Sequence, residues 1–108
     1  IVRNIKVTDV LMRYIVDLVR ATREPGKVDK ELGRAIQYGA SPRASINLAL
    51  TAKAYAFLQG RAFVVPEDVR AVAEDVMRHR IGLTYEAEAE NITSKDIVQK
   101  IISKVEVP

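Results

Sequence analysis

The stretch YGASPRASINLALTAKAYAFLQG, residues 38–60, decides the fold of this chain. Ser41 is a preferred N-cap residue, and Pro42 suits the first helical position, where its missing N–H costs nothing. Apolar residues then occupy nearly every side of a helix, and Gly60 is a typical residue for the position just after a helix end. A helix that is apolar nearly all round belongs in the middle of a bundle. We therefore predict a central helix that begins at Ser41.

Three further helices are predicted around it, which gives an all-α, four-helix bundle. Thr8 can cap a helix over residues 8–24, and Pro25-Gly26 ends it. Pro66 opens another helix that runs to about residue 80, with acidic residues in its first turn. Thr93 and Asp96 form a capping-box pattern before a last helix whose buried residues continue to position 105.

Two segments between these helices are less regular. Residues 27–40 predict a short helical turn near Asp29–Leu32, and the run 35–38 could form a short extended piece. Residues 82–92 alternate glutamates at 86, 88 and 90 with small or polar residues. We expect an exposed loop or strand-like connection there instead of a packed helix.

Length and composition fit one globular domain. The chain has 108 residues, 48% of them hydrophobic and 29% charged, with no cysteine and one histidine. Disulfides, thiol chemistry and a His-rich metal site are therefore excluded, and no apolar run is long enough to span a membrane. The chain starts at Ile1 inside sequence that already reads as structured. We expect residues 1–108 to be a single domain of a longer, cytoplasmic protein.

Catalytic patterns are not visible in the sequence. It has neither a P-loop nor a G-x-G-x-x-G pattern, and the lone His79 lies in a basic helix end, where a structural role is expected. The acid pairs at 67/68 and 74/75 are expected on solvated helix faces, and the aromatic residues in the core. Residues 1–43 carry nine Lys/Arg against five Asp/Glu, which could favour nucleotide, nucleic acid or an acidic protein, or form a solvated face.

Arg43 is the unusual residue. It falls in the first turn of the helix after Ser41, where the helix dipole disfavours a positive charge. One interpretation is an incidental surface residue. The other is that Arg43, the helix N-terminus and the Ser41 hydroxyl face an anion together. The planar guanidinium suits a phosphate because it donates two parallel charged hydrogen bonds.

The hexapeptide Gly39-Ala40-Ser41-Pro42-Arg43-Ala44 resembles the sensor-2 motif of MoxR-type AAA+ ATPases. The resemblance continues in order along nearly the whole chain and is most specific over residues 39–81. It does not include residues 24–37. The other matching stretches are Ala21-Thr22-Arg23, Gly60-Arg61, Val65-Pro66-Glu67-Asp68-Val69, His79-Arg80-Ile81 and Val105-Glu106-Val107-Pro108.

This resemblance implies a C-terminal AAA+ lid domain, whose nucleotide-binding core is not in this chain. Arg43 would be the sensor-2 arginine that contacts the γ-phosphate of ATP, supported by the helix start that Gly39, Ala40, Ser41, Pro42 and Ala44 form. ATP and Mg²⁺ would be bound mainly by the core, so we expect no cofactor, no metal and no catalysis in the fragment alone. The implied partners are the protein's own AAA+ core, neighbouring subunits in a ring and an unknown client that is remodelled in a chaperone-like way.

Two other functions stay open. A helical nucleic-acid-binding module would need a recognition helix with exposed polar residues, but the helix after Ser41 is too apolar. The last helix offers only residues typical of a solvated face, namely Lys95, Gln99, Lys100 and Lys104. A protein-interaction module without a link to nucleotide would instead leave Arg43 dispensable for any attached ATPase.

Overall fold

The first helix begins where the sequence predicts. In the computed structural model, which describes residues 5–108, the Thr8 hydroxyl accepts a hydrogen bond from the backbone N–H of Leu11 at 3.2 Å. Helix α1 (Asp9–Arg23) follows and ends at Glu24, immediately before Pro25. Its buried residues lie on one face, at the helical spacing that the sequence shows.

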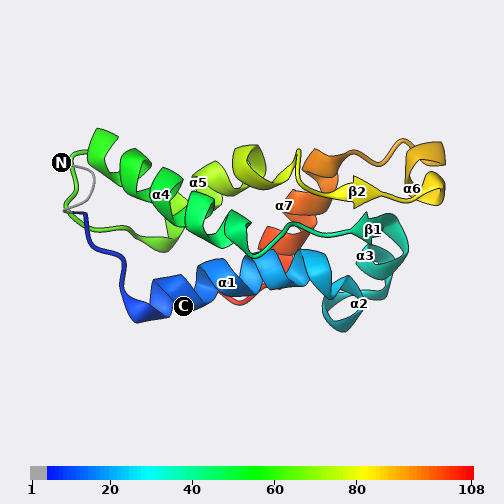
Figure 1. The fold of residues 1–108 in the computed structure, drawn as a ribbon, viewed down its shortest axis with the longest axis horizontal. Helices are drawn as coiled ribbons and strands as arrows, with labels where there is room; N and C mark the ends of the chain where they lie inside the picture. Colours follow the sequence, from blue (N-terminus) through cyan, green and yellow to red (C-terminus); the bar gives the residue numbers. More distant parts are fainter. Residues whose placement is uncertain (1–4) are drawn as a thin grey trace.

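All four predicted long helices are present, so the all-α class is confirmed. Helix α4 packs most extensively on α5, and both contact α1, while α7 packs against α5 and α1. The body is elongated, with principal extents of 44 × 21 × 21 Å (Figure 1). The three long helices besides α1 are α4 (Arg43–Leu58), α5 (Pro66–Met77) and α7 (Ser94–Lys104).

The less regular segments gather at one end of the body (Figure 1). The predicted extended piece is confirmed as a strand that pairs antiparallel with a second strand, Ile36 facing Leu83. The predicted turn near Asp29–Leu32 is a six-residue helix, and a further one-turn helix precedes it. In chain order the elements are α2 (Pro25–Val28), α3 (Lys30–Ala35), β1 (Ile36–Tyr38), β2 (Gly82–Leu83) and α6 (Tyr85–Ala89).

Helix α6 shows that the prediction for residues 82–92 is partly wrong. The segment begins as strand β2, but residues 85–89 then form a helix. The Thr84 hydroxyl caps it by accepting from the N–H of Ala87 at 3.2 Å, and Ala87 is buried on the side where α6 contacts α3. The cap and the buried alanine stabilise this single helical turn, and the side chains of Glu86, Glu88 and Glu90 remain exposed to solvent.

Helix α4 is not the fully enclosed helix that the sequence predicts. One side is buried through Ala44, Leu48, Ala49, Ala52 and Ala56. The opposite side leaves Ile46, Leu50 and Phe57 exposed. The aromatic residues depart from expectation in the same way, because only Tyr14 among them is buried. Small alanines let α5 and α1 approach closely, but no described residue covers the other side.

Asp68 also corrects a prediction, because it is fully buried and not on a solvated face. Its carboxylate accepts a hydrogen bond from the N–H of Val65 at 2.9 Å and pairs with the guanidinium of Arg61. The Nε atom of Arg61 is itself buried without a partner. This pair joins the turn after α4 to the start of α5.

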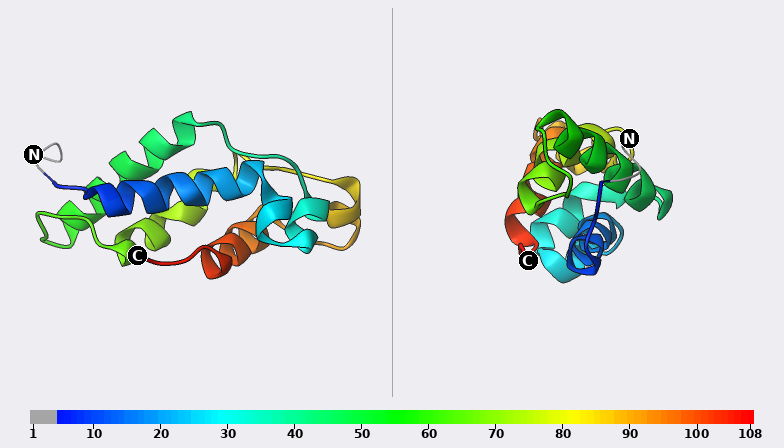
Figure 2. Two further views of the ribbon diagram at one scale, coloured as in Figure 1. Left: turned by 90° about the horizontal axis from the view of Figure 1, so that it is seen from below. Right: turned by 90° about the vertical axis from the view of Figure 1, so that its left-hand side faces the viewer.

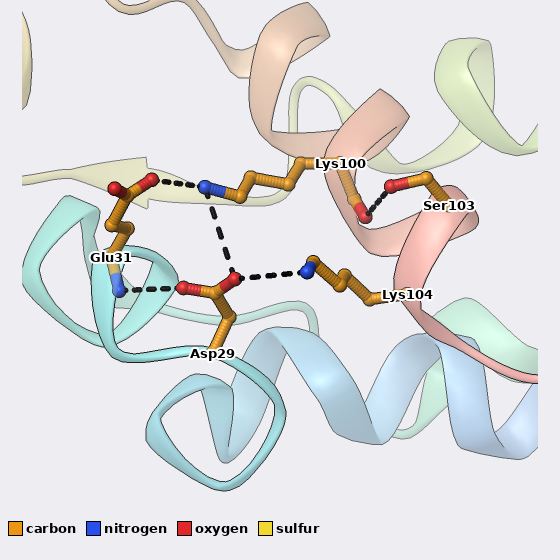
Figure 3. Close-up of polar contacts among 5 residues, drawn as sticks. All are labelled: Asp29, Glu31, Lys100, Ser103 and Lys104. Carbon is orange, nitrogen blue, oxygen red and sulfur yellow. Dashed lines mark hydrogen bonds and ion pairs between the residues drawn. The ribbon is translucent and has the colours of Figure 1, made fainter.

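Charged side chains connect the short helices to α7 (Figure 3). Asp29 caps α3 by accepting from the N–H of Glu31 at 2.8 Å, and its other oxygen lies 3.6 Å from Nζ of Lys104 and 3.9 Å from Nζ of Lys100. Lys100 also pairs with the carboxylate of Glu31. The backbone N–H at Glu31 and the two ammonium groups hold the pKa of Asp29 below its ordinary value.

We predict that Asp68→Ala lowers the free energy of unfolding by about 2–4 kcal/mol, because it leaves the partly buried Arg61 without its counter-charge and Val65 without an acceptor. Urea denaturation followed by circular dichroism measures this loss. The neighbouring exposed acid provides the control, and Glu67→Ala should stay within about 0.5 kcal/mol of the unchanged chain. Equal effects of the two substitutions would contradict the structural role of Asp68.

Acid should weaken the Asp29 cluster. A carboxylate with a lowered folded pKa stabilises the fold above its unfolded pKa, near 4, and that contribution disappears as the pH falls through the folded value. Asp29→Asn should therefore reduce the drop in urea midpoint between pH 6 and pH 3. Glu88→Gln, at an exposed position on α6, is the matched control and should leave the drop unchanged. The same drop in both variants would show that Asp29 contributes nothing.

Candidate functional site

The start of α4 differs from the prediction, because Ser41 is not the N-cap residue. The helix begins at Arg43, with Pro42 at the N-cap in helical conformation (φ −55°, ψ −26°), and no side chain caps it. The N–H of Ala44 instead bonds to the carbonyl of Ser41 at 2.9 Å. The Ser41 hydroxyl therefore does not cap the helix, because the chain enters α4 through a tight turn and not through an extended residue. Ser41 and Pro42 are both exposed.

Thr22 fixes the position of this helix start. Its hydroxyl accepts a hydrogen bond from the N–H of Ala40 at 2.9 Å and donates one to the carbonyl of Val19 at 2.6 Å. Thr22 is fully buried, and so is Ala40. The buried hydroxyl thus links the segment that leads into α4 to the last turn of α1.

Gly39 permits this contact because it has no side chain. A Cβ atom at Gly39 would lie 2.2 Å from the carbonyl oxygen of Thr22 and 2.7 Å from the N–H nitrogen of Arg23. Ala44, on the inner side of the first turn, is also fully buried. Among the predicted supporting residues, Gly39, Ala40 and Ala44 therefore set the close approach of α4, while Ser41 and Pro42 form its exposed tip.

Arg43 lies on the exposed side of the first turn of α4. No carboxylate of residues 5–108 forms an ion pair with it. In the left view of Figure 2 the first turns of α4 lie on the outer side of the molecule. The guanidinium is therefore free to meet a negatively charged group from outside the domain.

A groove of about 500 Å³ runs between the end of α1 and the start of α4. Arg20 and Arg23 line it from α1, and Pro42 and Ser45 line it from α4, together with Val16, Val19 and Glu24. Two arginines against the single acid Glu24, beside a helix N-terminus, leave an excess of positive charge in the groove, which suits an anion. Sequence reasoning missed this groove, since it did not bring the end of the first helix beside the start of α4. The Ala21-Thr22-Arg23 stretch was the signal that could have found it.

The other candidate residues do not form a site with Arg43. His79 is exposed at the end of α5, where its ring nitrogen accepts from Nε of Arg78 at 3.1 Å. The part of the chain that the structure describes contains no group of three or more His, Cys, Asp or Glu that could hold a metal ion. Within residues 5–108, every helix is also too short or too polar to cross a bilayer.

Comparison with known proteins gives consistent matches. The family model of the AAA lid domain matches residues 30–101. The protein "Chaperone MoxR1" of Mycobacterium tuberculosis is 37% identical over 99 residues, which is 91% of this chain and 26% of the relative. "Protein MoxR" of Paracoccus denitrificans is 44% identical over 79 residues, which is 68% of this chain and 23% of that protein.

A solved structure agrees with these matches. A protein from Cytophaga hutchinsonii, assigned as an ATPase, superposes with a TM-score of 0.95 at 44% identity. The superposition covers 99% of this chain and 33% of that protein. The chain thus spans between about a quarter and a third of the length of these relatives.

We predict that Gly39→Ala destabilises the domain by about 1–3 kcal/mol, because its Cβ would overlap the backbone of Thr22 and Arg23 and push the start of α4 away from α1. Gly26→Ala is the matched control. It meets no atom within 4 Å and lies in helix α2, so it should be neutral or slightly stabilising. Thermal unfolding of the two variants gives the comparison, and equal melting temperatures would contradict the close approach.

Proposed function

Because this chain belongs to the AAA lid domain family and is the C-terminal lid of a MoxR-type ATPase, we propose that it senses the nucleotide held by the ATPase core through Arg43. The lid then couples ATP binding and hydrolysis to the remodelling of client proteins. Arg43 acts as the sensor-2 residue, and Gly39, Ala40, Ser41, Pro42 and Ala44 form the helix start that presents it.

One observation carries this proposal: Arg43 is exposed at an uncapped helix start without a carboxylate partner in residues 5–108. The helix dipole and the groove arginines, Arg20 and Arg23, add positive potential on the same edge. A phosphate group from outside the domain would supply the negative partner that Arg43 lacks among residues 5–108. A guanidinium binds a phosphate through two parallel hydrogen bonds.

ATP differs from ADP by the terminal phosphate, and the lid would detect the presence of this phosphate. Bound in the core with Mg²⁺, ATP supplies an anionic group for Arg43, whereas ADP leaves the guanidinium without that partner. A ligand shifts a conformational equilibrium only by its different interaction with the two states. Arg43 supplies that different interaction, and the rigid attachment of α4 to α1 through Thr22 turns it into a movement of the whole lid.

The domain alone is a small fraction of a nucleotide site. One arginine and a helix end provide few contacts, so we expect no tight ATP binding by these 108 residues and no catalysis without the core. In the full-length ATPase we propose that the partners are its own core, neighbouring subunits in a ring and a client protein, all in the cytoplasm. The name of one relative, a chaperone, supports the remodelling role.

We predict that Arg43→Ala in the full-length ATPase lowers steady-state ATP turnover by about tenfold or more, which corresponds to about 1.4 kcal/mol of lost transition-state stabilisation. The variant should also bind ATP and ADP with more nearly equal affinity. Coupled-enzyme kinetics and separate nucleotide titrations measure the two effects. The matched control is Arg13→Ala, which removes an exposed arginine from the middle of α1 and should change neither quantity.

Circular dichroism and size-exclusion chromatography show whether fold and assembly are kept in both variants. Unchanged turnover together with unchanged ATP/ADP discrimination in Arg43→Ala would refute the sensing role. The domain would then be a protein-interaction module for which Arg43 is dispensable.

A further inference from the structure

A single side chain ties the segment that leads into α4, residues 39–43, to the end of α1. Within residues 5–108, the bond from the N–H of Ala40 to the Thr22 hydroxyl is the only hydrogen bond that joins this segment to a helix other than α4. The two turn hydrogen bonds of the same region close on residues 41–45. Loss of the Thr22 hydroxyl would therefore leave the direction of this segment to packing alone.

The Thr22 hydroxyl is itself held in a fixed direction. It donates to the carbonyl of Val19 at 2.6 Å, which leaves its lone pairs for the N–H of Ala40 at 2.9 Å. Among the non-aromatic polar and charged residues that the structure describes, only Thr22 and Asp68 are buried. Asp68 serves the start of α5, whereas Thr22 serves the backbone before α4.

This hydrogen bond acts close to Arg43. Ala40 lies three residues before the arginine, and Ala44 follows it directly. Both alanines are fully buried, whereas residues 41–43 between them are exposed. The burial of Ala44 determines which side of α4 faces inward, and the bond from Ala40 to Thr22 determines where the chain enters the helix. The backbone of Arg43 is therefore held between a packing contact and a hydrogen bond.

We propose that Thr22 is a positioning residue for nucleotide sensing, because its hydroxyl holds the backbone before α4 where Arg43 can meet a phosphate. This inference rests on the proposed function, in which Arg43 contacts the nucleotide. Thr22 is fully buried, so it acts only through the segment that it holds. The required precision is high, since a displacement of about 1 Å can cost on the order of a hundredfold in rate.

A purely structural role for Thr22 predicts a different result. Helices α1 and α4 pack on each other, and apolar residues of both, such as Leu18 and Leu48, belong to one buried core. We therefore expect the domain to fold without the Thr22 hydroxyl, with only the start of α4 less firmly held. A residue that merely stabilised the domain would affect turnover by the same factor with and without Arg43.

Thr22→Val in the full-length ATPase tests the proposal, because valine keeps the shape of the side chain and removes the hydroxyl. We expect ATP turnover to fall by about fivefold, less than in Arg43→Ala because the arginine is still present, and the preference for ATP over ADP to fall by about threefold. Thr22→Ser keeps the hydroxyl and should restore both to within about twofold. The matched control is Thr51→Val, which should change neither, since the Thr51 hydroxyl bonds only to the carbonyl of Asn47 within α4.

A double-mutant cycle with Arg43→Ala separates positioning from stability. If Thr22 acts through Arg43, adding Thr22→Val to Arg43→Ala should change turnover by no more than about twofold. An equal loss from Thr22→Val in the presence and in the absence of Arg43 would overturn the proposal. Full turnover in Thr22→Val, or a loss that Thr22→Ser does not restore, would overturn it as well.

Circular dichroism of the variants completes the test. Thr22→Ala is a second way to remove the hydroxyl, and a loss of folding in both Thr22→Val and Thr22→Ala would contradict the proposal, because the whole fold would then depend on Thr22. Unchanged turnover in Arg43→Ala would refute the sensing role, and the positioning role with it. Lost turnover in Arg43→Ala together with unchanged turnover in Thr22→Val would refute the positioning role alone.

Discussion

The hydrogen bond between the Thr22 hydroxyl and the N–H of Ala40 is the constraint on which the Arg43 edge of the domain depends. It joins residues that are 18 positions apart and is fully buried. A buried N–H without an acceptor is costly, so the contact holds the segment before α4 against the end of α1. The missing side chain of Gly39 makes the approach possible. This junction determines where α4 starts and on which side of the domain Arg43 lies.

The parts of the fold that depend on local chemistry could be predicted from the sequence. Thr8 and Thr93 begin helices because their hydroxyls accept from backbone N–H groups one turn later. Pro25 ends α1, and the apolar spacing identifies the buried sides of α1, α5 and α7. These signals act between residues that are close in the sequence, so they can be recognised without knowing the rest of the structure. The position of Arg43 in the first turn of α4 was predictable for the same reason.

Features that depend on distant residues could not be predicted. The burial of Asp68 requires Arg61 and the turn after α4, and the groove beside Pro42 requires the end of α1 to lie there. Ser41 has the chemistry of a cap, but the Thr22 junction directs the chain into a tight turn that leaves its hydroxyl unused. The exposed side of α4 is a different case. Its residues are apolar like core residues, and a prediction limited to one domain assigns them to that domain's own core.

Helix α4 spans the domain from Arg43 to the turn after Leu58. At one end is Arg43, and at the other the turn after the helix pairs with the beginning of the described chain, where the N–H of Lys6 bonds to the carbonyl of Ala62 at 3.0 Å. Sixteen residues place these ends about 24 Å apart.

In the proposed role, the charge of Arg43 at the tip of the helix would distinguish the ATP state from the ADP state. A tenfold preference between two lid positions needs a difference of about 1.4 kcal/mol, which one guanidinium–phosphate contact can provide. In the proposed role, the lid would therefore need no catalytic group of its own to respond to ATP.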